Sequence, residues 1–558
     1  MVSTYTNPEY PFRRSPDQDA SQAVHHPVII VGAGPSGLSA ALDLALQGIR
    51  TVVVDESNTV SIGSRAICFA KRTLEIMDRY GCGDRMVEKG VTWKIGKVFF
   101  QDEQIYEFNL LPEDGHKMPA FINLQQYYFE EYMVDRCADF DQIDLRWLSK
   151  ARNIEVRPDR VALLVETPQG DYPLTCDYLL VADGASSPIR ESLGLQMEGQ
   201  VFHDRFLIAD IVMKSQDFPT ERRYWFDPPF HRNHSVLLHK QPDNVWRIDI
   251  QLGWDADPVE EAKPEHVIPR IKAMLGEDVA FEPEWLSVYT FRCRRMKDFI
   301  YKDRIMFLGD AAHQVSPFGA RGANGAVQSV ENLCWKLKRV LTGEAPPALL
   351  ETYNIERSHG ADENLLNSTR TADFITPKNH ISRVFRDEVL RLAADYPFAR
   401  TLVNSGRLSR PCTLDGSPLN TPDEDDFGPH MRPGSVCRDA PIITGGKPAW
   451  LLGQLGNRFT LMVHGGAAEN PALANLQGMQ DLQLLTIGFD SDCGLPSRRI
   501  DDVRGIIEDA YQLQPGSCYL IRPDQHVCAR WRRFDVNRVI AAMQRALGQL
   551  LDETRMGA

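Results

Sequence analysis

A chain of 558 residues is longer than one ordinary domain, and 43% hydrophobic with 25% charged residues is typical of a globular protein with extensive cores. The net charge of −14 argues against nucleic acid and anionic membranes as partners. Residues 1–26 are polar and proline-rich, and no stretch makes ~20 continuous apolar residues, so we expect no membrane segment and a cytoplasmic location. The 11 cysteines include no CxxC pair and no zinc-finger spacing, which predicts reduced thiols and no metal site.

The segment VIIVGAGPSGLSAALDLALQGIRTVVVDES (residues 28–57) combines an apolar run, a glycine-rich turn, a helical pattern and a second apolar run. This order predicts a strand, a helix and a parallel strand. Gly32 would make the tight turn, Gly34 would let a pyrophosphate approach, and Gly37 would let the helix pack on the strand. Asp55 ends the second run, where a carboxylate accepts hydrogen bonds from an adenosine ribose, and an acid there favours FAD or NAD over NADP. The alternative is an ordinary βαβ turn with coincidental glycines.

Two later segments are typical of the remainder of a flavin site. In DYLLVADGASSPIR an apolar strand ends in Asp183-Gly184, and in RIMFLGDAAHQVSPFGARGAN another ends in Gly309-Asp310. Asp310 could meet a ribityl hydroxyl. Residues 319–324 would then direct backbone N–H groups and the N-terminus of the next helix at the electron-poor edge of a flavin ring.

Taken together and in this order, the three segments resemble the single-component, group A flavoprotein monooxygenases, which are aromatic hydroxylases similar to para-hydroxybenzoate and phenol hydroxylases. The resemblance runs from about residue 27 to 375. It implies an α/β fold, in which a Rossmann-like FAD-binding domain carries an inserted antiparallel-sheet substrate domain. No second glycine-rich nucleotide motif follows, so the implied co-substrate, NADH or NADPH, would dock transiently.

The resemblance also implies roles for single residues. Asp183 would lie near the FAD pyrophosphate, Asp310 would bind the ribityl chain, and Arg65 in GSRAICFA would sit over the cofactor. Gln126 would lie on the adenosine side, with Gln125 as the alternative if the register is off by one. A surface ion pair for Arg65 and a polar helix start for Gln126 are the alternatives to these roles. The positions that would line the isoalloxazine ring are Pro317, Gly322, Ala323 and Asn324.

Between the second and third motifs the periodicity changes to that of an antiparallel sheet, with strands expected at 221–226, 234–240 and 245–254. In the last, Arg247 falls on the polar face, and its R-x-x-x-Q spacing matches an arginine beside the flavin ring in the resembling hydroxylases. A cross-strand ion pair with Asp249 or a neighbour is the alternative. The candidates for a direct catalytic role are Arg247, Pro317 and Asn324.

The C-terminal part is predicted to form a helical segment, a Pro/Gly/Asp-rich linker and a separate unit. Strands are expected at 458–465, 482–489 and 517–531, and helices near 499–511 and 535–551. This order resembles the thioredoxin-like C-terminal domain of phenol-hydroxylase-type members, but the redox cysteine pair is absent, so we expect a packing or homodimer-interface role. The expected division is a polar arm (1–26), the FAD-binding domain (27–195 and 296–375), the substrate domain (196–295), the helical segment and linker (376–435) and the thioredoxin-like domain (436–558).

The leading hypothesis is therefore an enzyme that hydroxylates a phenolic ring, one that bears another polar substituent such as a carboxylate, in aromatic catabolism. NAD(P)H would reduce FAD, O₂ would add at flavin C4a, and the distal oxygen would pass from this hydroperoxide to the ring. The sequence does not identify a base for the phenol. The alternatives are another flavin-dependent oxidation (epoxidation, oxidase or halogenase type) or a non-catalytic flavin-binding scaffold. The halogenase pattern W-x-W-x-I-P is absent.

Overall fold

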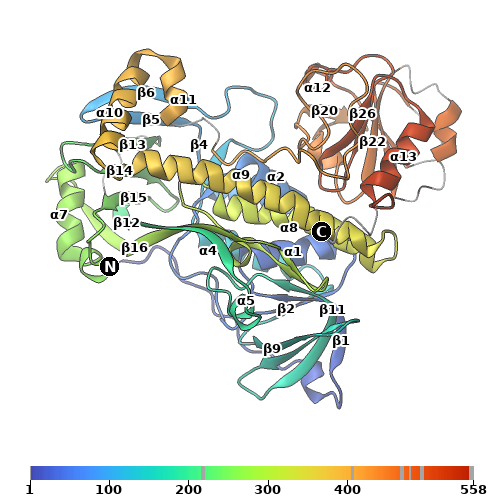
Figure 1. Ribbon diagram of the computed structural model, residues 1–558, viewed down its shortest axis with the longest axis horizontal. Helices are drawn as coiled ribbons and strands as arrows, with labels where there is room; N and C mark the ends of the chain where they lie inside the picture. The colour runs from blue at the N-terminus through green and yellow to red at the C-terminus, as the bar shows by residue number, and fades with distance from the viewer. Residues whose placement is uncertain are drawn as a thin grey trace.

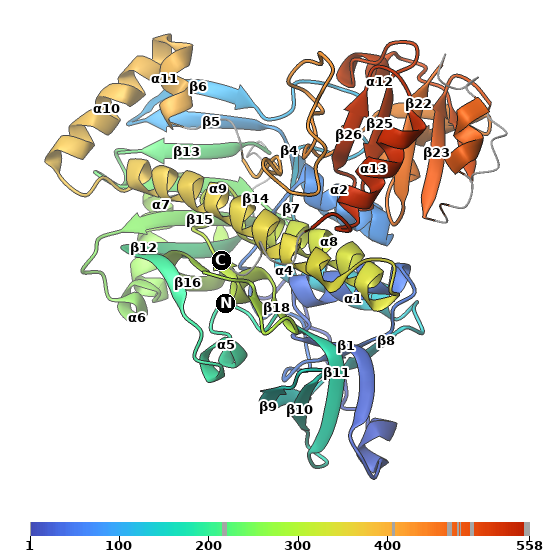
Figure 2. The same ribbon diagram turned by 45° about the vertical axis from the view of Figure 1, so that its right-hand side comes forward.

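The computed structural model describes residues 2–551 apart from 215–219, 404–407, 466–470, 477–478, 480 and 491–495. Two eight-stranded sheets and one five-stranded sheet organise this part of the chain (Figure 1). The long helix α9 (Glu351–Ile375) crosses the middle of the molecule, and the C-terminal unit lies at one side of it (Figure 2). None of the described helices is both long enough and apolar enough to cross a membrane.

The first sheet is mainly parallel and holds the N-terminal motif. In spatial order its strands are β17 (Ile300–Tyr301), β18 (Ile305–Phe307), β11 (Tyr172–Val181), β1 (Val24–Val31), β2 (Thr51–Val54) and β8 (Ile143–Arg146), with β10 (Val161–Glu166) and β9 (Lys150–Val156) joined through β11. The helices packed on one another beside it are α1 (Pro35–Leu46), α4 (Gln126–Cys137) and α8 (Gly322–Leu341). The predicted strand–helix–strand unit is confirmed. Strand β1 starts before the apolar run because residues 24–26 already pair with β11.

The N-terminal arm lies along the protein surface before β1 begins. Tyr5 stacks on Tyr127 with ring centroids 4.0 Å apart, and Tyr10 stacks on Trp147 at 4.5 Å. A short 3-10 turn, η1 (Pro16–Asp19), follows. These ring contacts attach the arm to α4 and to the segment after β8.

The second sheet forms the other half of the site. Its strands in spatial order are β19 (His313–Gln314), β16 (Phe281–Met296), β12 (Met197–Met213), β15 (Val245–Leu252), β14 (Ser235–Lys240), β13 (Arg222–Phe226), β5 (Ile95–Phe100) and β6 (Glu103–Asn109). The strands predicted at 221–226, 234–240 and 245–254 are confirmed, and they pair antiparallel. The apolar face of β15 packs with α7 (Pro264–Leu275), whereas Arg247 and Asp249 lie on the opposite face. Strands β5 and β6 join through a parallel pairing between β13 and β5.

Short elements connect the two sheets. A three-stranded sheet of β3 (Cys68–Ala70), β7 (Phe121–Asn123) and β4 (Val91–Trp93) lies next to α2 (Lys71–Tyr80) and α3 (Gly83–Lys89). Helix α9 ends at residue 375. After it, α10 (His380–Asp395) and α11 (Pro397–Val403) pack beside β6 (Figure 2). The remaining short helices are α5 (Pro188–Ser192), α6 (Pro258–Glu261), η2 (Gly309–Ala311) and η3 (Pro347–Leu350).

The C-terminal unit is a five-stranded mixed sheet in the order β24 (Ser497–Ile500), β23 (Leu482–Ile487), β22 (Phe459–His464), β25 (Cys518–Ile521) and β26 (Val527–Trp531). The strands predicted at 458–465 and 482–489 are confirmed. Its other elements are β20 (Pro441–Thr444), β21 (Lys447–Trp450), η4 (Leu452–Gln454), η5 (Pro471–Leu476), α12 (Ile506–Ala510) and α13 (Val536–Ala546). The thioredoxin-like assignment stays a prediction.

Two predictions in this unit were wrong. Residues 517–531 form two strands, because Pro523 lacks an N–H for the ladder and Gln525 has a positive φ of 58°, so the chain turns back. The helix expected near 499–511 is shorter. The strand β24 occupies its start, and α12 begins only where the carboxylate of Asp502 accepts the N–H groups of Ile506 and Ile507.

Candidate flavin and substrate site

The three sequence motifs meet at one edge of the parallel sheet. The last residues of four neighbouring strands, Val54, Val31, Val181 and Phe307, pair across the sheet in one row. The turns after these strands therefore leave from the same edge, which is where open α/β sheets bind their ligands. These turns carry Asp55, Gly32, Asp183 and Asp310, so the structure brings together residues from segments far apart in the chain.

The glycines of the first turn have two different surroundings. Gly32 has a φ of +104°, and a Cβ there would lie 2.4 Å from a backbone oxygen of the turn after β11. A Cβ at Gly37 would lie 1.8 Å from the carbonyl oxygen of Gly32, so the helix α1 requires glycine to pack this closely. A Cβ at Gly34 meets no atom within 4 Å. Gly34 is therefore held open at the N-terminus of α1, as a phosphate site requires.

Two of the predicted acidic residues are fixed by backbone N–H groups. The carboxylate of Asp55 accepts hydrogen bonds from Ala33 at 2.5 Å and from Ser57 at 2.7 Å. Oδ2 of Asp183 accepts the N–H of Ile189 at 3.1 Å, while its Oδ1 is buried and has no partner in the described residues. Burial raises the pKa of Asp183. A buried oxygen without a partner indicates a group that the protein itself does not supply.

Asp310 remains open to solvent beside the first motif. Although the residue is exposed, neighbouring protein atoms partly desolvate its carboxylate and raise its pKa to about 6, and the nearby charge of Arg65 acts in the opposite direction. A Cβ at Gly309 would lie 2.3 Å from Oγ of Ser36, so the third turn packs directly on the start of α1. Arg65 is exposed at this edge, close enough to Asp310 to influence its charge.

Two further residues join the second and third motif turns. The side-chain amide of Gln314 donates to the carbonyl oxygens of Ala185 at 2.7 Å and Asp310 at 3.0 Å. Nη1 of the buried Arg190 donates to the carbonyl oxygen of Ala311 at 2.9 Å. Sequence reasoning did not select Gln314, because a lone glutamine after a motif carries no spacing signal.

Together these features fit FAD. Gly34 and Gly184 leave space where a Cβ would stand, Asp183 has an oxygen in need of a donor, and Asp310 stays accessible. A dinucleotide laid along this edge would meet each of them in turn. Its pyrophosphate would then lie at the N-terminus of α1.

The loop before α8 provides the second contact surface of the site. Pro317 is exposed, and Gly319 and Ala320 both have positive φ, so the chain turns sharply before the helix starts. The first intrahelical hydrogen bond of α8 runs from Gly325 to Arg321. The backbone N–H groups of residues 322–324 therefore precede the hydrogen-bonded helix and are free to face a ligand.

The side chain of Asn324 has a structural role. Its Oδ1 accepts hydrogen bonds from the N–H of Ala70 at 2.8 Å and the hydroxyl of Thr73 at 2.6 Å. Its amide donates to the carbonyl oxygens of Cys68 at 2.9 Å and Ala320 at 2.6 Å. This amide binds β3 and α2 to the start of α8, so any contact between Asn324 and a flavin ring would come from its backbone.

We therefore expect Asn324→Ala to lower the free energy of unfolding by about 2–4 kcal/mol, because several buried groups lose their partner. Urea unfolding followed by circular dichroism measures this change. Thr371, which donates only to a backbone oxygen of its own helix, provides a control in Thr371→Ala, with an expected change of about 0.5 kcal/mol. Equal stability of Asn324→Ala and the wild type would contradict the anchoring role.

Arg247 also has protein partners. Its guanidinium makes a two-pronged ion pair with Asp210 on β12, at 2.8 and 2.7 Å. It also donates to the carbonyl oxygens of Ser64 and, at 3.3 Å, Arg65. The cross-strand pair is with Asp210 rather than Asp249, because residue 247 pairs with residue 210 in the register of the two strands. Arg247 thus holds the loop that carries Arg65.

The structure separates the two glutamine candidates. The side chain of Gln126 accepts the N–H of Ala66 at 3.0 Å and donates to Glu130 at 2.7 Å, so it lies against the loop that carries Arg65. The side chain of Gln125 is buried and donates to the carbonyl oxygen of Pro242 at 3.2 Å. Of the two, Gln126 is the one whose side chain contacts the loop of Arg65, and its place beside the cofactor stays a prediction.

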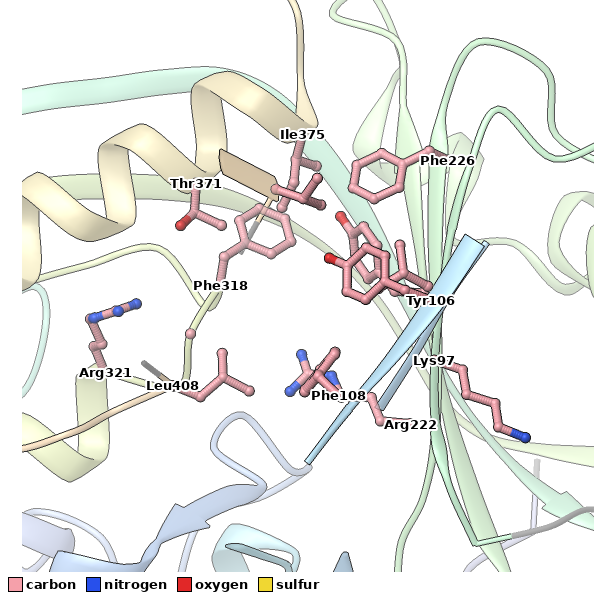
Figure 3. Close-up of a pocket in the computed structure, with 14 residues that line it drawn as sticks. Lys97, Tyr106, Phe108, Arg222, Phe226, Phe318, Arg321, Thr371, Ile375 and Leu408 are labelled. Carbon is pink, nitrogen blue, oxygen red and sulfur yellow. The ribbon is translucent and has the colours of Figure 1, made fainter. Parts of the chain in front are cut away.

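An aromatic pocket adjoins the loop before α8 (Figure 3). It contains about 650 Å³ of space not filled by protein atoms, part of it open to solvent. Its walls come from β5, β6 and β13, the end of α9 and the loop before α8. The lining residues are Lys97, Val98, Tyr106, Phe108, Arg222, Tyr224, Phe226, Phe318, Gly319, Arg321, Thr371, Ile375, Val403 and Leu408. Sequence reasoning missed the lining residues from β5 and β6, because these strands reach the pocket only through a long-range strand pairing.

Three features of the site define a flavin-dependent oxygenase. They are a glycine-rich turn for a dinucleotide, two further motif turns, and an aromatic pocket beside the loop expected to hold the flavin ring. Residues 25–368 match the family model described as "FAD binding domain". The chain is 30% identical to a 6-methylpretetramide 4-monooxygenase of Streptomyces rimosus, over 97% of this chain and 96% of that protein. It is 27% identical to a 3-(3-hydroxy-phenyl)propionate/3-hydroxycinnamic acid hydroxylase of Mycolicibacterium gilvum, over 67% and 65% of the two chains.

The fold is similar to that of solved flavoproteins. The flavin-dependent monooxygenase PieE, crystallised with FAD and substrate, aligns over 95% of this chain and all of its own, with a TM-score of 0.80 and 22% identity. The chain belongs to the FAD-binding-domain family of flavoprotein monooxygenases. It is an FAD-dependent aromatic hydroxylase, and NAD(P)H is the usual electron donor of this class.

Proposed function

We propose that the protein hydroxylates a phenolic ring bound in the aromatic pocket, with O₂ as the oxidant and NADH or NADPH as the electron donor. The observation that carries this proposal is that the pocket shares Phe318, Gly319 and Arg321 with the loop before α8. When bound, FAD supplies the oxygen-transfer chemistry. The chain holds the substrate ring between aromatic side chains, excludes water and directs the N–H groups of α8 at the ring edge of the flavin.

The proposed cofactor contacts follow the edge of the parallel sheet. For the dinucleotide we assign Gly32, Gly34, Gly37, Asp55, Arg65, Gln126, Asp183, Gly184, Gly309 and Asp310. For the flavin ring we assign Pro317 and the backbone of Gly322, Ala323 and Asn324. Support comes from the open space at Gly34 and the unpartnered oxygen of Asp183. In this proposal Arg247 acts by holding the loop that carries Arg65. The domain boundaries expected from the sequence are also part of the proposal.

The aromatic lining of the pocket and the named relatives favour a fused-ring phenol. Five aromatic side chains line the pocket, so a flat ring system can stack against its walls. The relative matched from end to end is named for 6-methylpretetramide, whereas the one named for a phenylpropionate matches over two thirds of the chain. We therefore propose a fused-ring phenol ahead of a single-ring acid. A role in aromatic catabolism stays a prediction.

The direct test is to measure NADH and NADPH oxidation by the FAD-loaded protein with a set of fused-ring and single-ring phenols. We expect at least one phenol to stimulate oxidation at least about tenfold, with an equal amount of hydroxylated product. Formation of hydrogen peroxide without a hydroxylated product from any phenol would favour an oxidase. Bound FAD with no NAD(P)H oxidation at all would indicate a scaffold.

The homodimer and the cytoplasmic location also remain proposals. Support for the homodimer comes from apolar side chains on α10 and α11 that are more than half exposed: Ile381, Phe385, Phe398 and Leu402. Exposed apolar side chains on neighbouring helices are common at contacts between protein chains.

A further inference from the structure

Arg222 brings a positive charge to the pocket without a counter-charge from the protein. Its guanidinium lies on the cavity side of β13, whereas the ammonium of Lys97 points away (Figure 3). Within the described part of the chain no carboxylate pairs with Arg222, and its Nη1 is buried without a hydrogen-bond partner. The contact that remains is with the ring of Trp93, whose centroid is 5.4 Å from Cζ.

Neighbouring cations on the same sheet are paired. Arg223, on the opposite face of β13, donates to Glu221 at 2.8 Å, and Lys97 pairs with the same carboxylate at 2.8 Å. Arg247 is paired with Asp210 at 2.7 Å. Nη1 of Arg222 is buried without a partner although the side chain as a whole is only half-buried. A buried donor left unpaired is unfavourable for folding, so a position that keeps one is typical of a binding role.

A hydroxyl group in the same pocket also lacks a partner. The phenolic oxygen of Tyr106 on β6 is buried and makes no hydrogen bond within the described residues. Strand β6 faces β13 across β5, and Tyr106 is directed into the pocket, as is Phe108 (Figure 3). The pocket thus combines aromatic walls, an arginine without an ion pair, and two buried hydroxyl groups without a hydrogen-bond partner in the described residues, those of Tyr106 and Tyr224.

We propose that Arg222 binds a carboxylate group of the substrate, and that Tyr106 adds a hydrogen bond to it. The substrate class is then an aromatic hydroxy acid, with its ring against Phe226 and Phe318 and its anionic end at β13. This inference rests on the proposed function, because it assumes that the aromatic pocket is the substrate site. A charge-assisted pair between arginine and a carboxylate is stronger than a neutral hydrogen bond, so charge should decide the choice of substrate.

The experiment uses the FAD-loaded protein and three matched probes: 3-hydroxy-2-naphthoate, its amide 3-hydroxy-2-naphthamide, and 2-naphthol. Binding is read from the change in the visible spectrum of the bound flavin. We expect the wild type to bind the carboxylate at least about tenfold more tightly than the amide, and Arg222→Met to abolish this preference. Arg222→Lys should retain part of the preference for the carboxylate. The control Arg223→Met, on the opposite face of the same strand, should retain the full preference for the carboxylate.

Thermal unfolding of each variant separates recognition from a structural role. Arg222→Met should unfold at the wild-type temperature or above, since it removes an unpaired charge, whereas an arginine that supported the fold would leave a less stable protein. Equal affinity of the wild type for carboxylate and amide, no binding of the carboxylate, or a preference that survives in Arg222→Met would each overturn the proposal. Hydroxylation of phenols that does not depend on Arg222 would contradict the role of Arg222 and leave the proposed function in place. If the carboxylate bound through Arg222 but no phenol were hydroxylated, the proposed function would be contradicted instead.

Discussion

Replacing Gly34 with alanine should leave the protein folded and weaken FAD binding by about two orders of magnitude, or ~2.8 kcal/mol. A Cβ at this position meets no protein atom within 4 Å, and the φ of −82° suits any residue. The methyl group would instead occupy the space at the N-terminus of α1 where we expect the pyrophosphate to approach the backbone. Titration of the apoprotein with FAD, followed by quenching of flavin fluorescence, measures the dissociation constant.

Two other glycines show whether the effect is specific. Gly253→Ala also places a Cβ in open space without a positive φ, but away from the motif turns, so it should bind FAD like the wild type. Gly37→Ala would place its Cβ 1.8 Å from a backbone oxygen and should destabilise the protein itself. The stability of Gly34→Ala should change by less than ~1 kcal/mol, as for a glycine lost from a helix N-cap. Wild-type affinity of Gly34→Ala for FAD would show that the pyrophosphate lies elsewhere.

The FAD-binding half of this molecule could be predicted from the sequence because its signals are local. The unit at residues 28–57 has its strand, turn, helix and acid within one short stretch, and both later motifs follow apolar strands directly. Parallel strands then bring these turns to one edge without further information.

The substrate pocket could not be predicted in the same way, because long-range pairing determines it. Tyr106 and Arg222 reach one cavity only because β13 pairs with β5, and nothing in either segment identifies the other. Arg247 shows a related limit. Its strand and its face of the sheet were predicted correctly, but its ion-pair partner depends on the register with β12, which the sequence does not determine. In the C-terminal unit, short apolar runs fit a helix and a strand equally well, which explains the wrong length near 499–511.

The second large effect concerns the contact between the C-terminal unit and the FAD-binding helices. Glu356 on α9 is fully buried and accepts hydrogen bonds from Arg522 at 2.6 Å and from Lys336 at 2.7 Å. Arg522 belongs to the turn between β25 and β26, so this carboxylate links the C-terminal sheet to α8 and α9. We expect Glu356→Gln to lower the free energy of unfolding by about 3–5 kcal/mol, because it leaves Arg522 and Lys336 buried with too little negative charge. Urea unfolding, followed by circular dichroism and by release of FAD, measures this loss.

The effect of Glu356→Gln should depend on pH. Burial acts to raise the pKa of Glu356, but the charges of Arg522 and Lys336 outweigh it and hold the pKa well below its usual range. A carboxylate with a lowered pKa in the folded state stabilises the protein at pH values above its unfolded pKa of about 4.5, and this contribution is lost as the pH falls through the folded value. The contribution of Glu356 to the difference between wild type and variant should therefore be fully present above about pH 4.5 and shrink below it. The control Glu388→Gln, in an exposed ion pair with Arg391, should change stability by less than ~1 kcal/mol. If Glu356→Gln behaved like this control, the buried network would not be what attaches the C-terminal unit to the helices that begin at the flavin loop.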